Sequence, residues 1–175
     1  MNKTEAQISV RGLTVAYGDF VLLKNADFDI NKGDVFIIMG ASGGGKSSLL
    51  RVLTGLVPAA SGRILIDGVD FTAATENERA KIMQKCGILY QSGALFSSMT
   101  LAENIALPLR QYTDYSDKLI SELVSLKLAL VGLTGFEEFY PSEISGGMKK
   151  RAGLARALAL DPGIVYFDEP SAGLD

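Results

Sequence analysis

One short stretch, set between an apolar run and a helix-like segment, constrains the fold of this chain most. Residues 35–39 are continuously apolar and predict a strand, and residues 48–53 predict a helix. Between them stands Gly, four residues, then Gly-Lys-Ser. Glycines let backbone N–H groups converge, and the following helix adds unpaired donors, so this order predicts a phosphate-binding loop. The loop comprises Gly40, Ala41, Ser42, Gly43, Gly44, Gly45, Lys46, Ser47 and Ser48.

Two side chains of this loop have separate predicted roles. Lys46 would reach the β- and γ-phosphates of a nucleotide, and the Ser47 hydroxyl would ligate Mg²⁺. The alternative is a glycine-rich turn that matches the pattern by accident. The strand and helix expected on its two sides argue against that alternative, so we expect a nucleotide phosphate site.

Length and composition set the class of protein. With 175 residues, 47% of them apolar and 21% charged, the chain can bury one real core, which predicts one globular domain that includes a subdomain. A net charge of −3 argues against a broadly basic surface, so no nucleic-acid partner is expected. Cys86 is the single cysteine, which excludes an internal disulfide and indicates a reducing compartment. It reads as a small core residue.

Targeting and metal-binding signals are also informative. The N-terminal residues contain no apolar signal region, and no apolar stretch approaches the length that spans a bilayer, so we expect a cytoplasmic chain. The sequence contains no histidine, which excludes histidine metal ligands and histidine general bases.

Patterning predicts the elements on both sides of the loop. Residues 8–16 and 21–30 alternate apolar and polar side chains around Gly18-Asp19, which predicts an antiparallel hairpin. After the first helix, a short strand over residues 63–68 ends at a turn. A weakly periodic helix over residues 76–84 and a short strand over residues 87–90 follow.

Between residues 100 and 160 the period becomes helical. Helices are predicted over residues 101–109, 117–131 and 148–160. Ser116 stands at the N-cap position of the second helix, and Gly132 stands just past its end. This part of the chain therefore predicts a helical insertion.

A final apolar run, Ile164–Phe167, ends in two acidic residues, Asp168 and Glu169. A continuous apolar run predicts a buried parallel strand, here one that delivers carboxylates at its C-terminal end. Ligands in open α/β sheets gather at those strand ends, where the phosphate loop is also expected.

The third predicted helix opens with Ser145, Gly146 and Gly147, an anion site by the same argument of free donors and helix dipole. The stretch 144–148 resembles the signature sequence of the ATP-binding-cassette (ABC) ATPases, and the other motifs stand in that family's order. Lys149, Lys150 and Arg151 follow, either near a bound phosphate or as a solvated basic face.

The resemblance implies a role for each matched residue. Tyr17 would stack on the adenine of ATP, although it could be an ordinary hairpin aromatic. Gln91 would touch Mg²⁺ and the attacking water, although alone it reads as a loop amide. Asp168 would hold Mg²⁺ through water, and Glu169 would polarise the water. The implied catalytic residues are Glu169, Lys46 and Gln91, and the implied metal-site residues are Ser47, Gln91 and Asp168.

The resemblance also implies the architecture and the partners. It implies an α/β fold, a P-loop NTPase core with a mainly parallel sheet, an N-terminal antiparallel β subdomain and a helical subdomain. Residues 1–95 and 160–175 would form the core, and residues 96–159 the helical signature subdomain. Two subunits would meet head to tail, with residues 171–175 crossing between the sites, and an integral membrane permease would dock near residues 91–109.

Two departures from the family pattern matter. Met148 replaces the usual glutamine, and with residues 90–96 and 149–152 this resembles the ATPases of Mce-type lipid transporters, which work on the cytoplasmic face of the inner membrane. The chain also ends at Asp175, before the last strands and the switch histidine of the family, so we expect weak nucleotide binding and poor turnover.

Two other functions stay open beside an ATP-hydrolysing transporter subunit. One is a soluble cassette protein of translation or DNA repair, and the other is a nucleotide-binding module without turnover. The compact segment 92–143 lacks the long insertions typical of the soluble class, which favours the transporter.

Overall fold

The structure is a computed structural model that describes residues 6–41 and 43–170. Contacts divide the chain into two compact units, Met1–Met83 and Gln84–Asp175, and each unit is described by itself. The predicted division into a core and a helical subdomain follows other boundaries and stays a prediction. Among the described residues, no helix combines the length and apolar character needed to cross a membrane.

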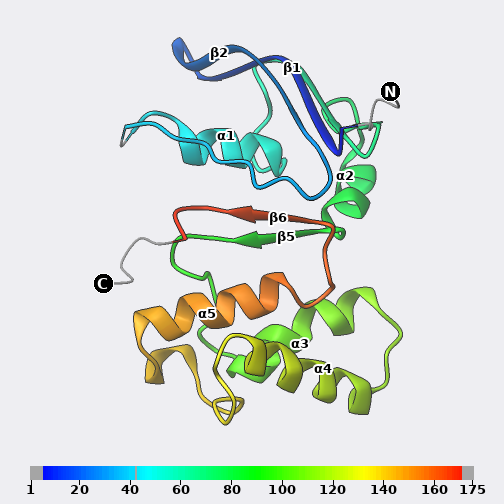
Figure 1. The fold of residues 1–175 in the computed structure, drawn as a ribbon, viewed down its shortest axis with the longest axis vertical. Coiled ribbons are helices and arrows are strands. Elements are labelled where there is room, and N and C mark those ends of the chain that lie inside the picture. Colours follow the sequence, from blue (N-terminus) through cyan, green and yellow to red (C-terminus); the bar gives the residue numbers. More distant parts are fainter. Residues whose placement is uncertain (1–5, 42, 171–175) are drawn as a thin grey trace. The chain divides into compact units, whose positions relative to one another are not determined.

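A four-stranded antiparallel sheet dominates the first unit (Figure 1). Strands β1 (Ile8–Tyr17) and β2 (Phe20–Ile30) form the predicted hairpin, which is confirmed. Strand β3 (Ser61–Ile66) pairs with the other side of β1, and the short β4 (Val69–Asp70) follows it, giving the order β2-β1-β3-β4.

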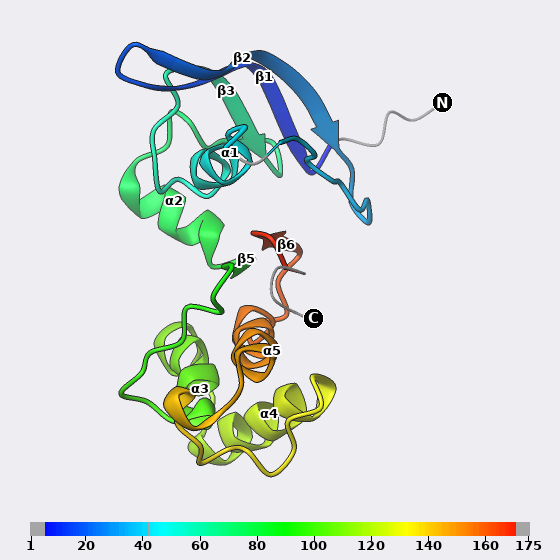
Figure 2. The same ribbon diagram turned by 90° about the vertical axis from the view of Figure 1, so that its left-hand side faces the viewer.

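Helix α1 (Lys46–Leu53) contacts β1 and lies against one face of this sheet, as Figure 2 shows. The helix begins two residues before the predicted start. It buries Leu49, Leu50, Val52 and Leu53, and the alternation of β1 supplies Ile8, Val10, Leu13 and Val15 to the same unit. Helix α2 (Glu76–Met83) confirms the predicted helix but buries no residue, in line with its weak periodicity.

Residues 35–39 do not form the strand that their composition predicts, so that prediction is wrong. Val35, Ile37 and Met39 are 88%, 70% and 86% exposed, and no strand is assigned to them. A strand needs a neighbour for its backbone hydrogen bonds, and no strand of the described residues pairs with this run. Phe36 stacks on Phe28 of β2 with ring centroids 5.0 Å apart.

The second unit contains two parallel strands and a helical layer. Strand β5 (Cys86–Leu89) pairs in parallel with β6 (Ile164–Phe167), with Leu89 opposite Phe167 at one end, which confirms the predicted parallel pairing. The predicted burial is not confirmed, because only Tyr166 of β6 is buried and Phe167 is 47% exposed. The single cysteine, Cys86, is half-buried at the start of β5. Figures 1 and 2 both show helix α5 (Gly146–Ala157) between this strand pair and the other helices.

Helices α3 (Leu101–Tyr112) and α4 (Asp117–Leu130) complete the layer, and a short 3-10 helix (Pro141–Glu143) precedes α5. Ser116 caps α4 by accepting from Leu119 N, and Gly132 has φ 68°, so both predicted ends of this helix are confirmed. The helices enclose one apolar cluster whose fully buried members include Leu101, Ile105, Leu109, Leu128, Leu133, Ala152 and Ala155. The antiparallel sheet, the parallel pair and the helical layer give the predicted α/β fold class.

Candidate functional site

The phosphate loop curls around its own lysine. Lys46 Nζ donates to Gly40 O at 3.1 Å and to Ala41 O at 2.9 Å, while Gly44 N donates to Ala41 O at 3.0 Å. These bonds hold the ammonium group among the loop's backbone atoms, immediately before α1. Ser42, also predicted to belong to the loop, lies outside the described residues.

Glycine is required at two positions of this turn. Gly45 is the N-cap of α1 with φ 82°, in the left-handed region where a Cβ is unfavourable. A Cβ on Gly44 would lie 2.9 Å from Ala41 O. The tight turn brings the helix N-terminus, with its partial positive charge, to the same place as the Lys46 ammonium. Both groups suit an anion, so the loop geometry fits a bound phosphate.

The strand pair of the second unit brings three predicted site residues to one sheet edge. Asp168 N donates to Leu89 O at 2.9 Å, which continues the ladder past the last pair of β5 and β6. Gln91 is exposed just beyond the same end of β5. Asp168 is half-buried, and Glu169 is exposed with φ 48°. An amide and two carboxylates therefore lie at the carboxyl ends of neighbouring parallel strands. Side chains that bind metal ions or water are expected at this position in such sheets.

The remaining predicted residues occupy separate places. Tyr17 lies at the end of β1 and is 45% exposed, as a ring available for stacking must be. Lys46 and Ser47 belong to the first unit, whereas Asp168 and Glu169 belong to the second. Their meeting in one nucleotide site stays a prediction. No group of three or more Cys, Asp or Glu side chains within residues 6–41 and 43–170 is arranged to hold a metal ion.

The signature sequence forms a capped helix start. Ser145 is the N-cap of α5, and its Oγ accepts from Met148 N at 3.2 Å. Arg151 is exposed, and its Nη1 donates to Val131 O at 2.9 Å and to Gly132 O at 3.1 Å. Arg151 thereby caps the C-terminus of α4, where a cation opposes the helix dipole favourably. The residues 171–175, expected to cross between sites, lie outside the described part of the chain.

The loop that follows Gln91 is held by Arg156, which sequence reasoning missed. Arg156 Nη1 donates to Ala94 O at 2.9 Å and Nη2 to Gly93 O at 3.3 Å, and the guanidinium lies 5.7 Å from the centroid of Phe96. Burial lowers the pKa of Arg156 from its usual value, and the nearby Tyr90 opposes that shift. No local sequence signal marked this contact, because the loop and Arg156 are far apart in the chain.

Asn104 holds the other end of the same loop. It is fully buried, and its Oδ1 accepts from Phe96 N at 2.8 Å. Its Nδ2 donates to Phe96 O, Met99 O and Thr100 O at 3.1, 3.2 and 2.9 Å. An asparagine on the apolar face of a predicted helix was a signal that could have revealed it, since buried amides need such partners.

Comparison with known proteins tests the resemblance. A family model described as ABC transporter matches residues 23–172, which include the phosphate loop, the signature sequence and the acidic pair. The chain belongs to the ABC transporter family. Over 168 residues it is 48% identical to the "Probable ribonucleotide transport ATP-binding protein mkl" of Mycobacterium leprae and 43% identical to the "Intermembrane phospholipid transport system ATP-binding protein MlaF" of Haemophilus influenzae.

These relatives are longer than the chain. The matches cover 96% of the chain but 48% of the mycobacterial protein and 64% of the Haemophilus protein. The fold is also similar to a solved ATP-binding cassette, MJ0796, described as a dimeric post-hydrolysis state bound to ADP and Pi. That similarity has a TM-score of 0.89 at 31% identity and covers 96% of this chain and 76% of the other. The predicted fold class and family are thereby confirmed.

Proposed function

We propose that this chain is the ATP-binding part of an ATP-hydrolysing subunit that powers a membrane transporter. The observation that carries the proposal is the family match, which spans the phosphate loop of one unit and the acidic strand end of the other. Relatives named as transport ATP-binding proteins support the transporter class over a soluble protein of translation or DNA repair. No described feature favours that soluble class.

The loop residues would bind the phosphates of ATP. Lys46 already lies over the loop through hydrogen bonds to two neutral carbonyl oxygens, which it can exchange for bonds to the anionic oxygens of the β- and γ-phosphates. The N-terminus of α1 adds backbone donors and partial charge, and Tyr17 offers its exposed ring to the adenine. This chain's own contribution is therefore binding and orientation.

The strand-end residues would serve the reaction itself. Ser47, Gln91 and Asp168 would hold Mg²⁺, which supplies charge neutralisation to the phosphates when bound. Glu169 would orient and polarise the attacking water. Residues 145–147 of a second copy would complete each site in a head-to-tail dimer. The dimeric post-hydrolysis state of the related cassette supports both dimerisation and hydrolysis.

A phospholipid is the cargo class that we favour. The relatives' names divide between phospholipid and ribonucleotide transport, so they do not choose between cargoes. The sequence adds Met148 after Ser-Gly-Gly, which resembles the lipid-transporter ATPases. The chain would then act at the cytoplasmic face of the inner membrane, through the permease.

One face of α4 supports docking of such a permease. Leu119, Leu126 and Leu130 are 39%, 52% and 67% exposed, and Leu123 is partly buried between them. Their spacing of four, three and four residues places them on one side of the helix. An exposed apolar stripe of this kind fits an amphipathic helix from a partner. We propose this stripe as part of the docking site, beside the region 91–109.

The test of nucleotide binding uses Lys46→Ala. We expect Mg²⁺-ATP to bind the 175-residue chain detectably and the variant at least about tenfold more weakly, because the loop loses its flexible cation. Lys118→Ala, on exposed α4, is the matched control and should bind as the unaltered chain does. Equal ATP affinity in Lys46→Ala, measured by calorimetry, would reject the phosphate loop as the binding site.

The test of the transporter class is association with a membrane protein. We expect an integral membrane permease to co-purify with the unaltered chain and to be lost when Leu126→Glu interrupts the apolar stripe. Glu122→Gln, one turn earlier on α4, is the control. Recovery of ribosomal or DNA-repair proteins instead would favour the soluble class.

A further inference from the structure

A groove between α3 and α4 is lined by no residue assigned to the nucleotide site. It encloses about 340 Å³ within the second unit. Its floor includes Ala102 and Ala106 of α3 and Ile120 and Val124 of α4. The two alanines are one helical turn apart, and their small side chains leave space beside the larger residues of the neighbouring helix.

The rim of this groove is acidic. Four carboxylates line it against one guanidinium, and these residues are Glu103, Asp117, Glu137, Glu138 and Arg110. Arg110 Nε lies 4.0 Å from Asp117 Oδ1, and both side chains are mostly exposed, so this pair neutralises little. Glu103 accepts from Thr100 N at 2.8 Å as part of the α3 capping box. The Glu137 and Glu138 side chains form no ion pair with any described residue.

The groove and the leucine stripe face different directions from α4. Ser121 lines the groove, and Leu126 of the stripe follows five residues later, which is about 140° around an α-helix. The residues that form the groove floor, Ile120 and Val124, are buried on the α3 side. A molecule in the groove therefore leaves the stripe accessible, although the groove shares Ala102, Glu103 and Ala106 with the region 91–109 that we propose for docking of the permease.

The chemistry of the groove selects among possible occupants. Nucleic acid and anionic lipid are repelled by its carboxylates. These carboxylates do not form a metal cluster, because none is found among the described residues. A lysine or arginine side chain matches both parts of the groove: its aliphatic stem can lie on the apolar floor while its cation meets the rim. Arginine can also form two parallel bonds to a carboxylate.

We propose that this groove binds a basic segment of a partner protein, with an arginine or lysine side chain inserted between α3 and α4 toward Glu137 and Glu138. The two glutamates belong to the loop that closes one end of the α3 helix, because Ala102 N donates to Glu137 O at 2.9 Å. Their side chains can therefore be changed without removing that backbone bond. The proposal does not depend on ATP binding.

The probe is an alanine-based helical peptide with two arginines four residues apart, and its partner peptide carries glutamates instead. Binding to the full 175-residue chain is measured by fluorescence anisotropy at low salt, and amide NMR shifts locate the site. We expect only the arginine peptide to bind, with shifts concentrated at the groove. Binding should weaken as ionic strength rises.

The deciding variant is Glu137→Lys with Glu138→Lys, compared with Asp114→Lys and Glu122→Lys, which make the same charge change outside the groove. We expect a loss of about tenfold or more in affinity for the first pair and little change for the second. Glu137→Gln with Glu138→Gln keeps the shape of both side chains and should also weaken binding. Weaker binding in this variant would show that a loss in the lysine variant is not caused by misfolding alone.

Three results would overturn the proposal. One is an equal loss for both lysine pairs, which would mean general attraction to an acidic surface. The second is NMR shifts spread beyond the groove. The third is concentration-dependent self-association abolished by the Glu137 and Glu138 changes, which would assign the groove to a second copy of this chain. Retained peptide binding in Lys46→Ala separates this test from that of the proposed nucleotide site.

Discussion

At the residue scale, the second unit buries one lysine whose partner is exposed. Lys127 on α4 is 6% exposed and pairs with Asp161, which is 81% exposed in the connection between α5 and β6. Burying an ammonium group is costly without a counter-charge, so the ion pair between Asp161 and Lys127 stabilises the second unit. Composition gave no indication of this pair, because 34 residues separate the partners.

We expect Asp161→Asn to destabilise the chain by about 1 kcal/mol, which is less than breaking a fully buried pair costs, because Asp161 is exposed and water reaches it. Asn suits this position, since residue 161 has φ 48°. Lys127→Met should lower the free energy of unfolding by less than Asp161→Asn does, because it removes the buried charge that needs a partner. Urea unfolding at neutral pH measures both, with Asp114→Asn as the control; a larger loss for Lys127→Met would contradict this account.

The local structure around the predicted site residues was predictable in proportion to how local its sequence signals are. The turn before α1 and the helix starts at Ser116 and Ser145 were predictable, because a loop pattern or a helix cap depends on consecutive residues. The bonds of Arg156 to Ala94 and Gly93 join residues more than 60 positions apart, so no window of sequence contains them. The candidate site could thus be named from sequence, but the groups that hold its loop could not.

At the element scale, the connection from β5 to α3 is fixed by two side chains from different helices. Arg156 of α5 holds its first part and Asn104 of α3 its last part. Gln91 lies near the start of this connection. The position of Gln91 relative to the start of α5 therefore depends on the contacts of both Arg156 and Asn104. The loop should therefore be more rigid than its exposure alone suggests.

We expect Arg156→Met to raise amide hydrogen exchange across residues 93–99 by about tenfold or more, since two bonds to a charged donor are lost. Exchange in β5 and β6 should change little, because their ladder does not include Arg156. Mass spectrometry after deuterium labelling reads both regions in one sample. Arg110→Met is the control, and uniform exchange changes throughout the second unit would indicate general destabilisation instead.

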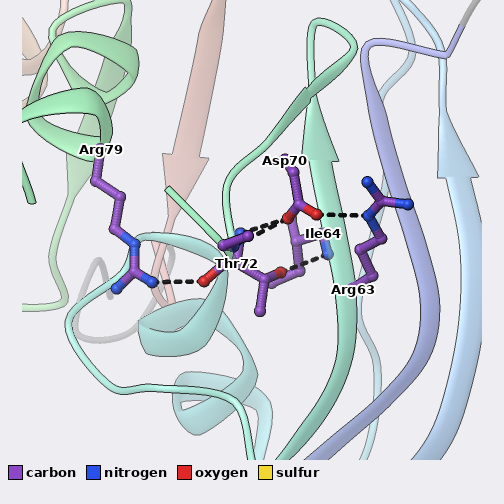
Figure 3. A network of polar contacts seen from close by, with 6 residues as sticks. Arg63, Ile64, Asp70, Thr72 and Arg79 are labelled. Carbon is purple, nitrogen blue, oxygen red and sulfur yellow. Dashed lines mark hydrogen bonds and ion pairs between the residues drawn. The ribbon is translucent and has the colours of Figure 1, made fainter. Parts of the chain in front are cut away.

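Asp70 of β4 makes an acid-sensitive contact with Arg63 of β3 and with the residues that follow β4, shown in Figure 3. Asp70 accepts from Arg63 Nε at 2.5 Å and from Thr72 N and Ala73 N at 3.0 Å. Burial tends to raise the pKa of Asp70, but the bonds from Ala73, Arg63 and Thr72 outweigh it and hold the pKa below its usual value. The folded state therefore favours the ionised carboxylate.

The sign of the pH effect follows from that lowered pKa. Asp70 contributes stability above its unfolded pKa, about 3.9, and this contribution is lost as pH falls through the lower folded value. We expect Asp70→Asn to lower the midpoint of thermal unfolding at pH 7, with the difference from the unaltered chain shrinking below about pH 4. Asp19→Asn is the control. A difference that persists undiminished at pH 2 would show that shape, not charge, is responsible.

At the scale of the whole molecule, elements whose backbone finds hydrogen-bonding partners within the described residues were predictable. Elements without such partners were not. The alternating hairpin and the capped α4 formed as predicted because their hydrogen bonds close locally. Strands β5 and β6 also formed, since each finds the other despite their separation in sequence. Residues 35–39 have equally strong strand composition but no pairing neighbour, so composition predicted an element that the described structure does not contain.

The exposed run 35–39 leads to a prediction about association. It presents Val35, Ile37 and Met39 to solvent beside an unpaired backbone. Unpaired apolar backbone of this kind is a template for pairing with another chain. We therefore expect the 175-residue chain to self-associate at micromolar concentrations and to bind a hydrophobic dye, as judged by sedimentation velocity and fluorescence.

The variants Val35→Lys and Ile37→Lys together should abolish most of this association, because charge at a strand edge opposes edge-to-edge pairing. Val21→Lys with Val69→Lys is the matched control, since these residues are 49% and 50% exposed but belong to strands that already have a partner. If both pairs of changes reduced association equally, net charge would be responsible instead of the unpaired run. If neither did, the associating surface would lie elsewhere, and the exposed leucines of α4 would be the next surface to change.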